Sequence, residues 1–352
     1  MNMPAATEAF VGQVVNDVAA ALSGVMTSMG HKLGLYAAMA NAGPMSSQAL
    51  ADKTALTERY VREWLNNQTA GGYIHYHADS QCYELPDAHI PVLADPDSPL
   101  FLIPALEVGA SLWMDEENLI NIFKSGQGMA WGQHHHRLFC GSESLFRPGY
   151  KAFLTTHWLA AMDGMQERLA TGARVADVGC GHGASTIVMA EAYPNSRFYG
   201  FDSHAHSIET AGCRAEEAGV ADNIDFQVAK AKDYEETGFD LICFMDCLHD
   251  MGDPEGAAAH VRQTLKDDGT WMIVEPMAGD SLSENLNPVS RLYYAFSTMI
   301  CVPASKDQEV GLALGAQAGE KRIGEVIKTG GGFSHFKRAT ETPFNLILEA
   351  RI

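Results

Sequence analysis

Three closely spaced glycines are the residues of this sequence that are best placed to do chemistry. Gly179, Gly181 and Gly183 end an apolar run, Val175–Val178, and precede a segment with helical periodicity. A strand, a glycine turn and a helix N-terminus form half of a nucleotide-binding α/β fold. Glycine suits this turn because a residue without Cβ reaches positive φ and lets a ligand lie against the peptide plane.

An acidic residue follows the glycine turn, at the end of the next expected strand. Asp202 comes directly after Ser196–Phe201, and a carboxylate there can accept hydrogen bonds from both hydroxyls of a ribose. The turn fits two cofactor patterns: GxGxxA, which ends at Ala184 and suits a pyrophosphate, and GxGxG, which Asp177 precedes. The late position of this unit and the antiparallel end of the chain favour the second pattern.

His249 is the candidate general base. It follows the apolar strand Phe239–Met245, at the carboxyl edge where parallel sheets bind their ligands. Imidazole has an ordinary pKa of about 6.5, and Asp250 or Glu275 could hold its other ring nitrogen. A helix cap or a packed core histidine is the competing interpretation, but the position favours a catalytic role.

The elements that position these residues alternate between strand and helix from Ala173 onward, which is typical of a parallel sheet. We expect strands at 175–178, 196–201, 224–228, 239–245 and 270–275, and antiparallel strands at 333–338 and 344–349. The predicted fold class is α/β: a Rossmann-like, seven-stranded, mostly parallel sheet with an antiparallel last strand. The long stretch 277–329 is predicted to form a helical cap over the site.

The first 95 residues have the pattern of a winged helix. Helices are expected at 5–22, 32–40, 48–53 and 57–65, and a β-hairpin at 73–85. Winged helices often bind DNA, but Glu58 and Glu63 accompany the two arginines of the last of these helices, and such a surface repels phosphate. We therefore predict a dimerisation domain rather than a DNA-binding domain.

A helical connector is predicted between the two ends of the chain, so the expected domains are 1–95, 96–165 and 166–352. The connector contains His134, His135 and His136. Adjacent histidines in an irregular segment seldom bind one ion, and no cysteine or acid lies at ligand spacing from them. We interpret this run as a loop in solvent or at a pocket edge, and we predict no metal site.

Length and composition argue against several classes of protein. The chain has 352 residues, of which 46% are hydrophobic, and its formal net charge of −20 argues against a nucleic-acid partner. We find no run of about 18 apolar residues and no basic, apolar leader, so neither a membrane span nor a secretion signal is expected. Seven scattered cysteines form no CxxC pair and indicate reduced thiols in the cytoplasm.

Several motifs together resemble those of class I S-adenosylmethionine-dependent methyltransferases: Asp177–Gly183, Asp202, Phe239–Leu241 and Leu265–Gly269. The segment Leu248–Asp250, with Asp253 and Glu275 further on, resembles the winged-helix small-molecule O-methyltransferases of the caffeate and hydroxyindole type. The resemblance implies that His249 is the base and that Glu275 steadies it. This chain departs from the pattern at Lys230, where an acid often contacts adenine, and at Met245, where plant-type enzymes have a lysine.

The resemblance implies S-adenosylmethionine as the cofactor, a small and partly aromatic hydroxylated acceptor, and a homodimer. The residues expected to bind the cofactor lie at the ends of the first four strands: Asp177, Gly179, Cys180, Gly181, Gly183, Asp202, Ser203, Ala229, Lys230, Asp246 and Cys247. The acceptor pocket is expected to be apolar and aromatic: Phe146, Tyr150, Tyr293, Tyr294, Phe296 and Met299. Two alternatives remain open, a winged-helix regulator that senses S-adenosylmethionine or a metabolite, and an NAD-dependent dehydrogenase.

Overall fold

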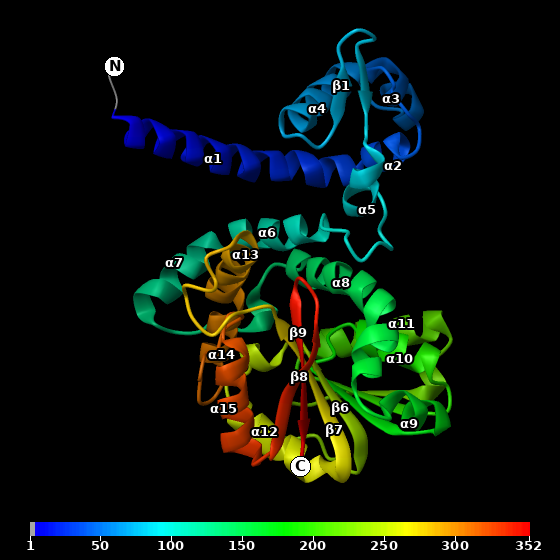
Figure 1. Cartoon of the computed structure of the whole chain (residues 1–352), viewed down its shortest axis with the longest axis vertical. Coiled ribbons are helices and arrows are strands. Elements are labelled where there is room, and N and C mark those ends of the chain that lie inside the picture. The colour runs from blue at the N-terminus through cyan, green and yellow to red at the C-terminus, as the bar shows by residue number, and fades with distance from the viewer. Residues whose placement is uncertain (1–3) are drawn as a thin grey trace. The chain divides into compact units, whose positions relative to one another are not determined.

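The computed structural model describes residues 4–352, and the chain divides into two compact units (Figure 1). The first unit comprises the residues up to Ala110 together with Arg137–Gly149. The second comprises Ser111–His136 and Tyr150–Ile352. Residues 96–165, which the sequence predicts as a connector, thus contribute to both units.

The first unit contains a winged helix. Its elements are α1 (Ala5–Lys32), α2 (Leu35–Met39), α3 (Ser47–Thr54), α4 (Glu58–Ala70) and an antiparallel hairpin of β1 (His75–His77) and β2 (Cys82–Glu84). The unit continues with η1 (Asp87–His89), α5 (Ile90–Leu93), most of α6 (Pro104–Met114) and α8 (Arg137–Gly149). Leu35, Leu50 and Leu65 pack in one core cluster between the helices and the hairpin. Ser46 caps α3, with Oγ accepting from the Ala49 amide at 3.1 Å.

The first helix is longer than the sequence predicted. α1 continues to Lys32 rather than ending at Leu22. The extension buries its last turns against α4, where Gly30 lets the Trp64 ring approach so closely that an added Cβ would lie 2.3 Å from it. Glu107 of α6 holds the same end of α1 through a hydrogen bond from Ser28 Oγ and an ion pair with Lys32 at 2.8 Å.

Much of α1 is nevertheless exposed and apolar. Its large apolar side chains in solvent are Phe10, Val11, Val14, Val15, Val18, Leu22, Val25 and Met29. An 18-residue window of the helix has a mean hydropathy of 1.4, so by length and composition alone α1 could cross a membrane. The sequence of this helix contains no unbroken apolar run, because polar residues such as Gln13 and Asp17 interrupt its apolar residues.

The second unit is built on a seven-stranded sheet, as predicted. Its strands are β3 (Arg174–Val178), β4 (Arg197–Asp202), β5 (Ile224–Val228), β6 (Phe239–Met245), β7 (Leu265–Pro276), β8 (His335–Glu341) and β9 (Asn345–Arg351). They lie in the order β5-β4-β3-β6-β7-β9-β8, and β9 is antiparallel to both of its neighbours. Because Val178 pairs with Phe201 on one side and Phe244 on the other, the carboxyl ends of β3, β4 and β6 meet at one edge.

Helices flank both faces of this sheet (Figure 1). α9 (Met165–Thr171), α10 (Ala184–Ala192) and α11 (Ala205–Ala218) lie on one side, and α12 (Pro254–Thr264) and α15 (Gly319–Gly331) on the other. α15 packs against α12, and its Ile323 and Ile327 join the core cluster around Trp271. Residues 277–329 were predicted to form a cap, and the α15 part of them instead completes this helical layer.

The second unit also contains several shorter elements. They are α7 (Glu116–Ser125), η2 (Trp131–Gln133), η3 (Tyr150–Trp158), η4 (Leu159–Ala161), η5 (Ala221–Asn223), η6 (Leu248–Asp250), α13 (Pro288–Phe296), η7 (Ser297–Cys301) and α14 (Val302–Asp307). η3 and η7 are π-helical. Both η7 and α14 contact η6, the short turn that carries His249.

Candidate active site

The glycine turn after β3 has the backbone that the sequence predicted. Gly179, Gly181 and Gly183 have φ of +74°, +53° and +76°, which an L side chain rarely adopts. A Cβ on Gly179 would lie 2.8 Å from Sγ of Cys247, whereas one on Gly181 would meet nothing within 4 Å among the described residues. The backbone at Gly181 therefore faces open space, into which a ligand can come.

Asp202 holds this turn in shape. Oδ2 of Asp202 accepts from the Gly181 amide at 2.9 Å, and Oδ1 accepts from the His204 amide at 2.8 Å. Burial raises the pKa of Asp202 despite these two donors. Each oxygen keeps a further lone pair, so the carboxylate can still accept from a ligand hydroxyl. Ala229 is tied to the same strand end, because its amide donates to the Asp202 carbonyl at 3.0 Å.

Asp177, in β3 just before the glycine turn, connects this strand to α10. Its Oδ2 accepts from Ser185 Oγ and Thr186 Oγ1, both at 2.6 Å, and the side chain is fully buried. Burial raises the pKa of Asp177 to about 6. Because this side chain is engaged with the first turn of α10, its observed role is to fix the helix to the strand. Lys230, expected near adenine, has its amide bound to Asp233 Oδ1 at 2.7 Å.

The imidazole of His249 is held by a carboxylate from the neighbouring strand. Nδ1 of His249 lies 2.6 Å from Oε2 of Glu275, which ends β7, and Oε1 of Glu275 accepts from the Leu248 amide at 3.1 Å. Both side chains are buried. Of the two partners proposed from the sequence for this ring nitrogen, the structure places Glu275 there.

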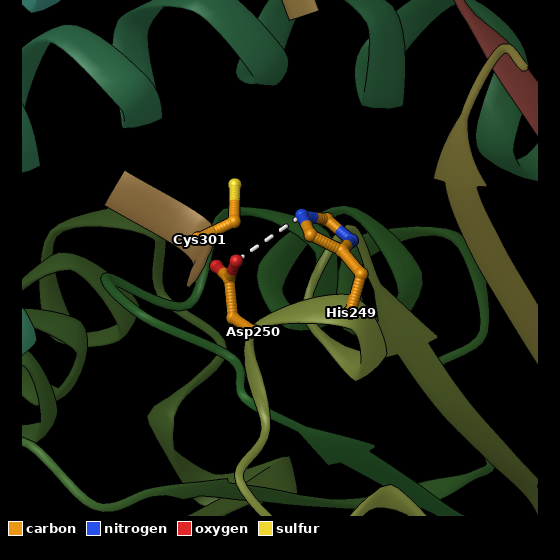
Figure 2. A group of neighbouring side chains, drawn as sticks. All are labelled: His249, Asp250 and Cys301. Atoms are coloured by element: carbon orange, nitrogen blue, oxygen red, sulfur yellow. Dashed lines mark ion pairs between the residues drawn. The ribbon is translucent and has the colours of Figure 1, made fainter. Parts of the chain in front are cut away.

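Asp250 lies on the other side of the same ring. Its Oδ1 is 3.2 Å from Nε2 of His249, and Figure 2 shows this pair beside Cys301. Burial disfavours a charged imidazole, but the carboxylates of Glu275 and Asp250 outweigh burial and hold the pKa of His249 well above its ordinary value. This shift from the intrinsic value of about 6.5 does not follow from the sequence alone. Its cause, two flanking acids, depends on tertiary contacts.

A strained acid lies between the glycine turn and the histidine. Asp246 has a φ of +52°, unusual for a residue with a side chain, and Oδ1 accepts from Asn345 Nδ2 at 2.9 Å. Its Oδ2 has no hydrogen-bond partner among residues 4–352. Burial, followed by the charge of Glu275, raises the pKa of Asp246 to about 8. Next to it, Cys247 donates from Sγ to the Val178 carbonyl at 3.1 Å, which joins the ends of β6 and β3.

The backbone around the histidine is clamped by α14 and the loop that follows it. Gln308 accepts from the Gly252 amide and donates to the Asp250 carbonyl, both at 3.0 Å. Ser305 Oγ donates to the Met251 carbonyl at 2.8 Å. No role for Gln308, Ser305 or Cys301 follows from the sequence, because their proximity to His249 arises only when the 277–329 stretch folds back on η6.

The aromatic residues expected to line the acceptor pocket do not all belong to one unit. Phe146 is part of α8 in the first unit, and the others lie in the second unit. Tyr150 and Tyr293 are buried, and the charge of Asp246 adds to burial in raising the pKa of each, which places both near that acid. Tyr293 donates its hydroxyl to the Phe344 carbonyl at 2.9 Å. Tyr294, Phe296 and Met299 are partly exposed on α13 and η7.

The histidine run differs from its sequence interpretation. His134 is buried rather than solvated, and its Nδ1 lies 2.8 Å from Oδ2 of Asp115. This acid precedes the run by too many residues for a spacing rule to find it. His136 alone of the three is exposed.

Comparison with known proteins divides the chain in the same way as its sequence. Residues 20–95 match the model of an Rv2258c-like winged HTH domain, and residues 169–331 match the model of a methyltransferase domain. The chain thus contains a methyltransferase domain and an N-terminal winged-helix domain.

Individual relatives agree with this assignment. A 27-O-demethylrifamycin SV methyltransferase of Amycolatopsis mediterranei is 31% identical over 35% of this chain and 44% of its own length. The chain spans less than half of the length of the curated relatives that it matches. A mitomycin 7-O-methyltransferase has the same fold with a TM-score of 0.69 and 17% identity, over 99% of this chain and 100% of that one. Human N-acetylserotonin methyltransferase, solved with S-adenosylmethionine, also has this fold. Its TM-score is 0.66 and its sequence identity 18%, over 99% of this chain and 98% of that one.

Proposed function

We propose that this protein transfers a methyl group from S-adenosylmethionine to the hydroxyl of a small, partly aromatic metabolite, with His249 as the general base. The observation that carries the proposal is the buried pair of His249 and Glu275 at 2.6 Å, beside the open glycine turn. Cys247 connects the two parts, because it contacts Gly179 and belongs to the segment that leads into η6.

The residues of the turn fit the cofactor. Three glycines with positive φ and open space at Gly181 permit a ligand to lie against the backbone. Asp202 would accept from the ribose hydroxyls, and we keep Gly179, Cys180, Ser203, Ala229 and Lys230 as neighbours of the nucleoside. When bound, S-adenosylmethionine supplies a methyl group that its sulfonium has already activated.

The acids around the site suit a cationic cofactor. Asp250 and Glu275 concentrate negative charge, which adds to burial in raising the pKa of Asp246 to about 8. A positive sulfonium is attracted to such a field. We propose that Asp246 and Cys247 line the cofactor side of the site.

His249 is placed to receive the proton that the acceptor hydroxyl loses. The active form carries a proton on Nδ1, donated to Glu275, and a free lone pair on Nε2. The hydroxyl proton would pass to Nε2 while the oxygen bonds to the methyl carbon and the bond from that carbon to sulfur breaks, which leaves S-adenosylhomocysteine. A positioned base contributes roughly 10²–10⁴-fold, and alignment of the reacting atoms up to ~7–11 kcal/mol. Gln308 and Ser305 support this alignment by fixing the backbone of the η6 segment.

The acceptor is proposed to lie between the histidine and the aromatic residues of the cap. Tyr150 and Tyr293 are buried near Asp246, and Tyr294, Phe296 and Met299 belong to the cap elements α13 and η7, of which η7 contacts η6. Aromatic and thioether side chains favour a flat, apolar acceptor.

We propose a homodimer formed through α1. Val11, Val15, Val18, Leu22, Val25 and Met29 are spaced by four, three, four, three and four residues, and all are exposed. This heptad spacing places them on one stripe, which suits a second α1 better than lipid on all sides. The opposite face carries polar residues such as Asn16 and Ser23.

The charges of α4 and the state of the cysteines support two further proposals, one on nucleic-acid partners and one on the compartment of the protein. Each arginine of α4 forms an ion pair with a glutamate of the same helix, Arg59 with Glu63 and Arg62 with Glu58. We therefore propose no nucleic-acid partner. All seven cysteines are free, which supports a reducing compartment, and we propose the cytoplasm.

Two measurements test the proposal. Calorimetry with S-adenosylhomocysteine tests cofactor binding, and failure of the wild-type protein to bind would remove the first half of the proposal. Labelled S-adenosylmethionine, offered with a panel of phenols and other hydroxylated aromatics, tests transfer. Absence of label in every acceptor, with cofactor binding intact, would favour a sensor of S-adenosylmethionine instead.

A further inference from the structure

Three side chains with different metal-ligand atoms meet beside the candidate base. Nε2 of His249, a carboxylate oxygen of Asp250 and Sγ of Cys301 all lie within 4.8 Å of one another (Figure 2). His249 and Cys301 are buried, and Asp250 is partly exposed. An imidazole, a carboxylate and a thiol thus converge on one small volume with a path to solvent on the side of Asp250.

We propose that these three residues form a Zn²⁺ site. Zinc accepts nitrogen, oxygen and sulfur ligands, and three protein ligands leave a fourth position for water or a substrate oxygen. Ligand atoms around a tetrahedral zinc lie roughly 3–4 Å apart, given metal–ligand distances of about 2.0–2.3 Å. Because the three atoms already lie within 4.8 Å, small side-chain rotations bring them to these separations.

The contact of Nδ1 with Glu275 orients the imidazole so that Nε2 can bind a metal. Nδ1 of His249 lies 2.6 Å from Oε2 of Glu275. Metal-binding histidines almost always donate their second N–H to a carboxylate or carbonyl, which fixes the tautomer and the ring orientation. Glu275 therefore directs the lone pair of Nε2 toward Asp250 and Cys301.

A local irregularity of the backbone brings the thiol to this place. Cys301 is the last residue of η7, a π-helical segment between α13 and α14. π-helical turns are rare and occur often at functional sites, because the wider turn redirects the side chains that follow. Burial raises the pKa of Cys301 to about 12, so without a metal it stays a thiol. Methyl transfer to a hydroxyl has no step for this group.

Charge and proton balance also suit a divalent cation. The carboxylates of Asp250 and Glu275 lie 3.2 Å and 2.6 Å from the two ring nitrogens of His249. Zinc binding forms bonds from the metal to Nε2, to the Asp250 oxygen and to Sγ. The thiol proton of Cys301, and a proton on Nε2 where one is present, are released to solvent. No electron transfer takes place.

Zinc and the acceptor proton compete for the same lone pair of Nε2. This consequence rests on the proposed function: while zinc is bound, His249 cannot act as a base, so zinc inhibits methyl transfer reversibly. The binding itself does not depend on the reaction and can be measured without any acceptor.

The test uses the full-length protein, freed of metal with a chelator that is then removed. Zn²⁺ is titrated by calorimetry, and Co²⁺ serves as a spectroscopic probe because a Co²⁺–thiolate bond gives a charge-transfer band in the near ultraviolet. We expect one Zn²⁺ per chain and a cobalt thiolate band. In Cys301→Ser the band is lost and the zinc affinity falls by about tenfold or more, as it does in His249→Gln.

Matched variants separate this site from surface binding. Cys213→Ser removes an exposed thiol and should keep the band, and His136→Ala removes an exposed histidine and should keep the stoichiometry. Circular dichroism confirms the fold of each variant. A wild-type protein without the thiolate band, or Cys301→Ser binding zinc as tightly as wild type, overturns the proposal.

The kinetic test compares each protein with its own metal-free rate. Zinc at site-saturating concentration should stop wild-type turnover, a chelator should restore it, and Cys301→Ser should lose a smaller fraction of its rate. A protein that shows the thiolate band but no methyl transfer without zinc would retain the zinc site and lose the proposed function. Wild-type turnover unchanged by saturating zinc would show that the metal does not occupy Nε2.

Discussion

The imidazole of His249 and the carboxylate of Glu275 form a pair 2.6 Å apart whose side chains are only 4% and 2% exposed. One follows β6 and the other ends β7, and these strands are parallel neighbours. The pair is therefore fixed by the sheet rather than by a loop. A buried carboxylate on Nδ1 keeps the ring in one tautomer and stabilises the imidazolium that forms when Nε2 takes a proton.

Replacing the carboxylate should slow the reaction without releasing the cofactor. In Glu275→Gln the amide keeps the shape but loses the charge that stabilises the imidazolium. We expect kcat to fall by about 10²-fold or more, with affinity for S-adenosylhomocysteine within about threefold of wild type. Steady-state kinetics and calorimetry measure the two effects. An unchanged kcat would show that Glu275 does not act through His249.

Loss of the Asp202 carboxylate should act on cofactor binding instead. Both of its oxygens accept from backbone amides of the cofactor segment, Gly181 and His204. In Asp202→Asn the side-chain amide can replace only one of these acceptors and presents N–H to the other donor. We expect this variant to bind S-adenosylhomocysteine about tenfold more weakly, or worse. Calorimetry checks this, and equal affinity in the variant would argue against the ribose role.

Two glycines of the turn should respond differently to alanine. A Cβ at position 183 would lie 2.7 Å from the Phe226 ring and 3.0 Å from Ala211, whereas one at position 181 meets nothing within 4 Å among the described residues. Both positions carry the strain of positive φ, which costs roughly 1–2 kcal/mol. Gly183→Ala adds a clash of about 1–3 kcal/mol.

Urea unfolding of both variants and calorimetry with S-adenosylhomocysteine compare them. We expect Gly183→Ala to be the less stable, and Gly181→Ala to keep more of its stability while losing cofactor affinity. Gly181→Ala with wild-type affinity would mean that no ligand approaches the turn there.

A charge in the apolar stripe of α1 should dissociate the dimer. Leu22 belongs to the stripe and is exposed, so Leu22→Glu would place two carboxylates at the shared seam. Ala20→Glu, on the opposite face of the same helix, is the matched control. Light scattering after size exclusion should show wild type and the control as dimers and Leu22→Glu as a monomer. A monomeric wild type that binds lipid vesicles through α1 would contradict the dimer and favour a membrane.

The first unit should lose stability in acid through Glu107. Burial pushes its pKa up, but hydrogen bonds from Lys32, Ser28 and Arg137 outweigh burial and bring the pKa to about 2. Because the folded pKa lies below the ordinary 4.5, the carboxylate stabilises the fold above that pH and ceases to do so as pH falls toward 2.

Denaturant unfolding of wild type and Glu107→Gln at a series of pH values measures this contribution. The two proteins should differ most near neutral pH and converge progressively as the pH falls from 4.5 to about 2. Glu8→Gln, which removes an exposed acid of α1, is the control and should follow wild type. A wild-type advantage that is independent of pH would assign the effect to packing.

Local sequence patterns predicted the sheet well. The strands expected at 224–228 and 239–245 are those observed, because the first alternates apolar and polar residues and the second is a mostly apolar run, both typical of strands. The predicted end of α1 was wrong. Gly24 and Gly30 resemble residues that end a helix, and only packing against Trp64 shows why the helix continues. The raised pKa of His249 could not be predicted for a related reason, because Asp250 and Glu275 were both candidate partners but their positions around the ring were not known.

The contacts of residues 297–308 with η6 were the part of the candidate site that the sequence predicted least. Cys301 and Gln308 reach η6 through a π-helical turn and a loop, and neither has a residue spacing that predicts such a contact. Spacing rules find partners on one helix or one strand. They cannot find partners that two segments more than 50 residues apart bring together.

Turnover of His249→Gln tests the central claim most directly. The glutamine is neutral, fills a similar volume and cannot accept the proton. With labelled S-adenosylmethionine and a working acceptor, we expect kcat to fall by about 10²–10⁴-fold while S-adenosylhomocysteine binds as it does to wild type. A variant that binds the cofactor and turns over at the wild-type rate would contradict the role of His249 as the base.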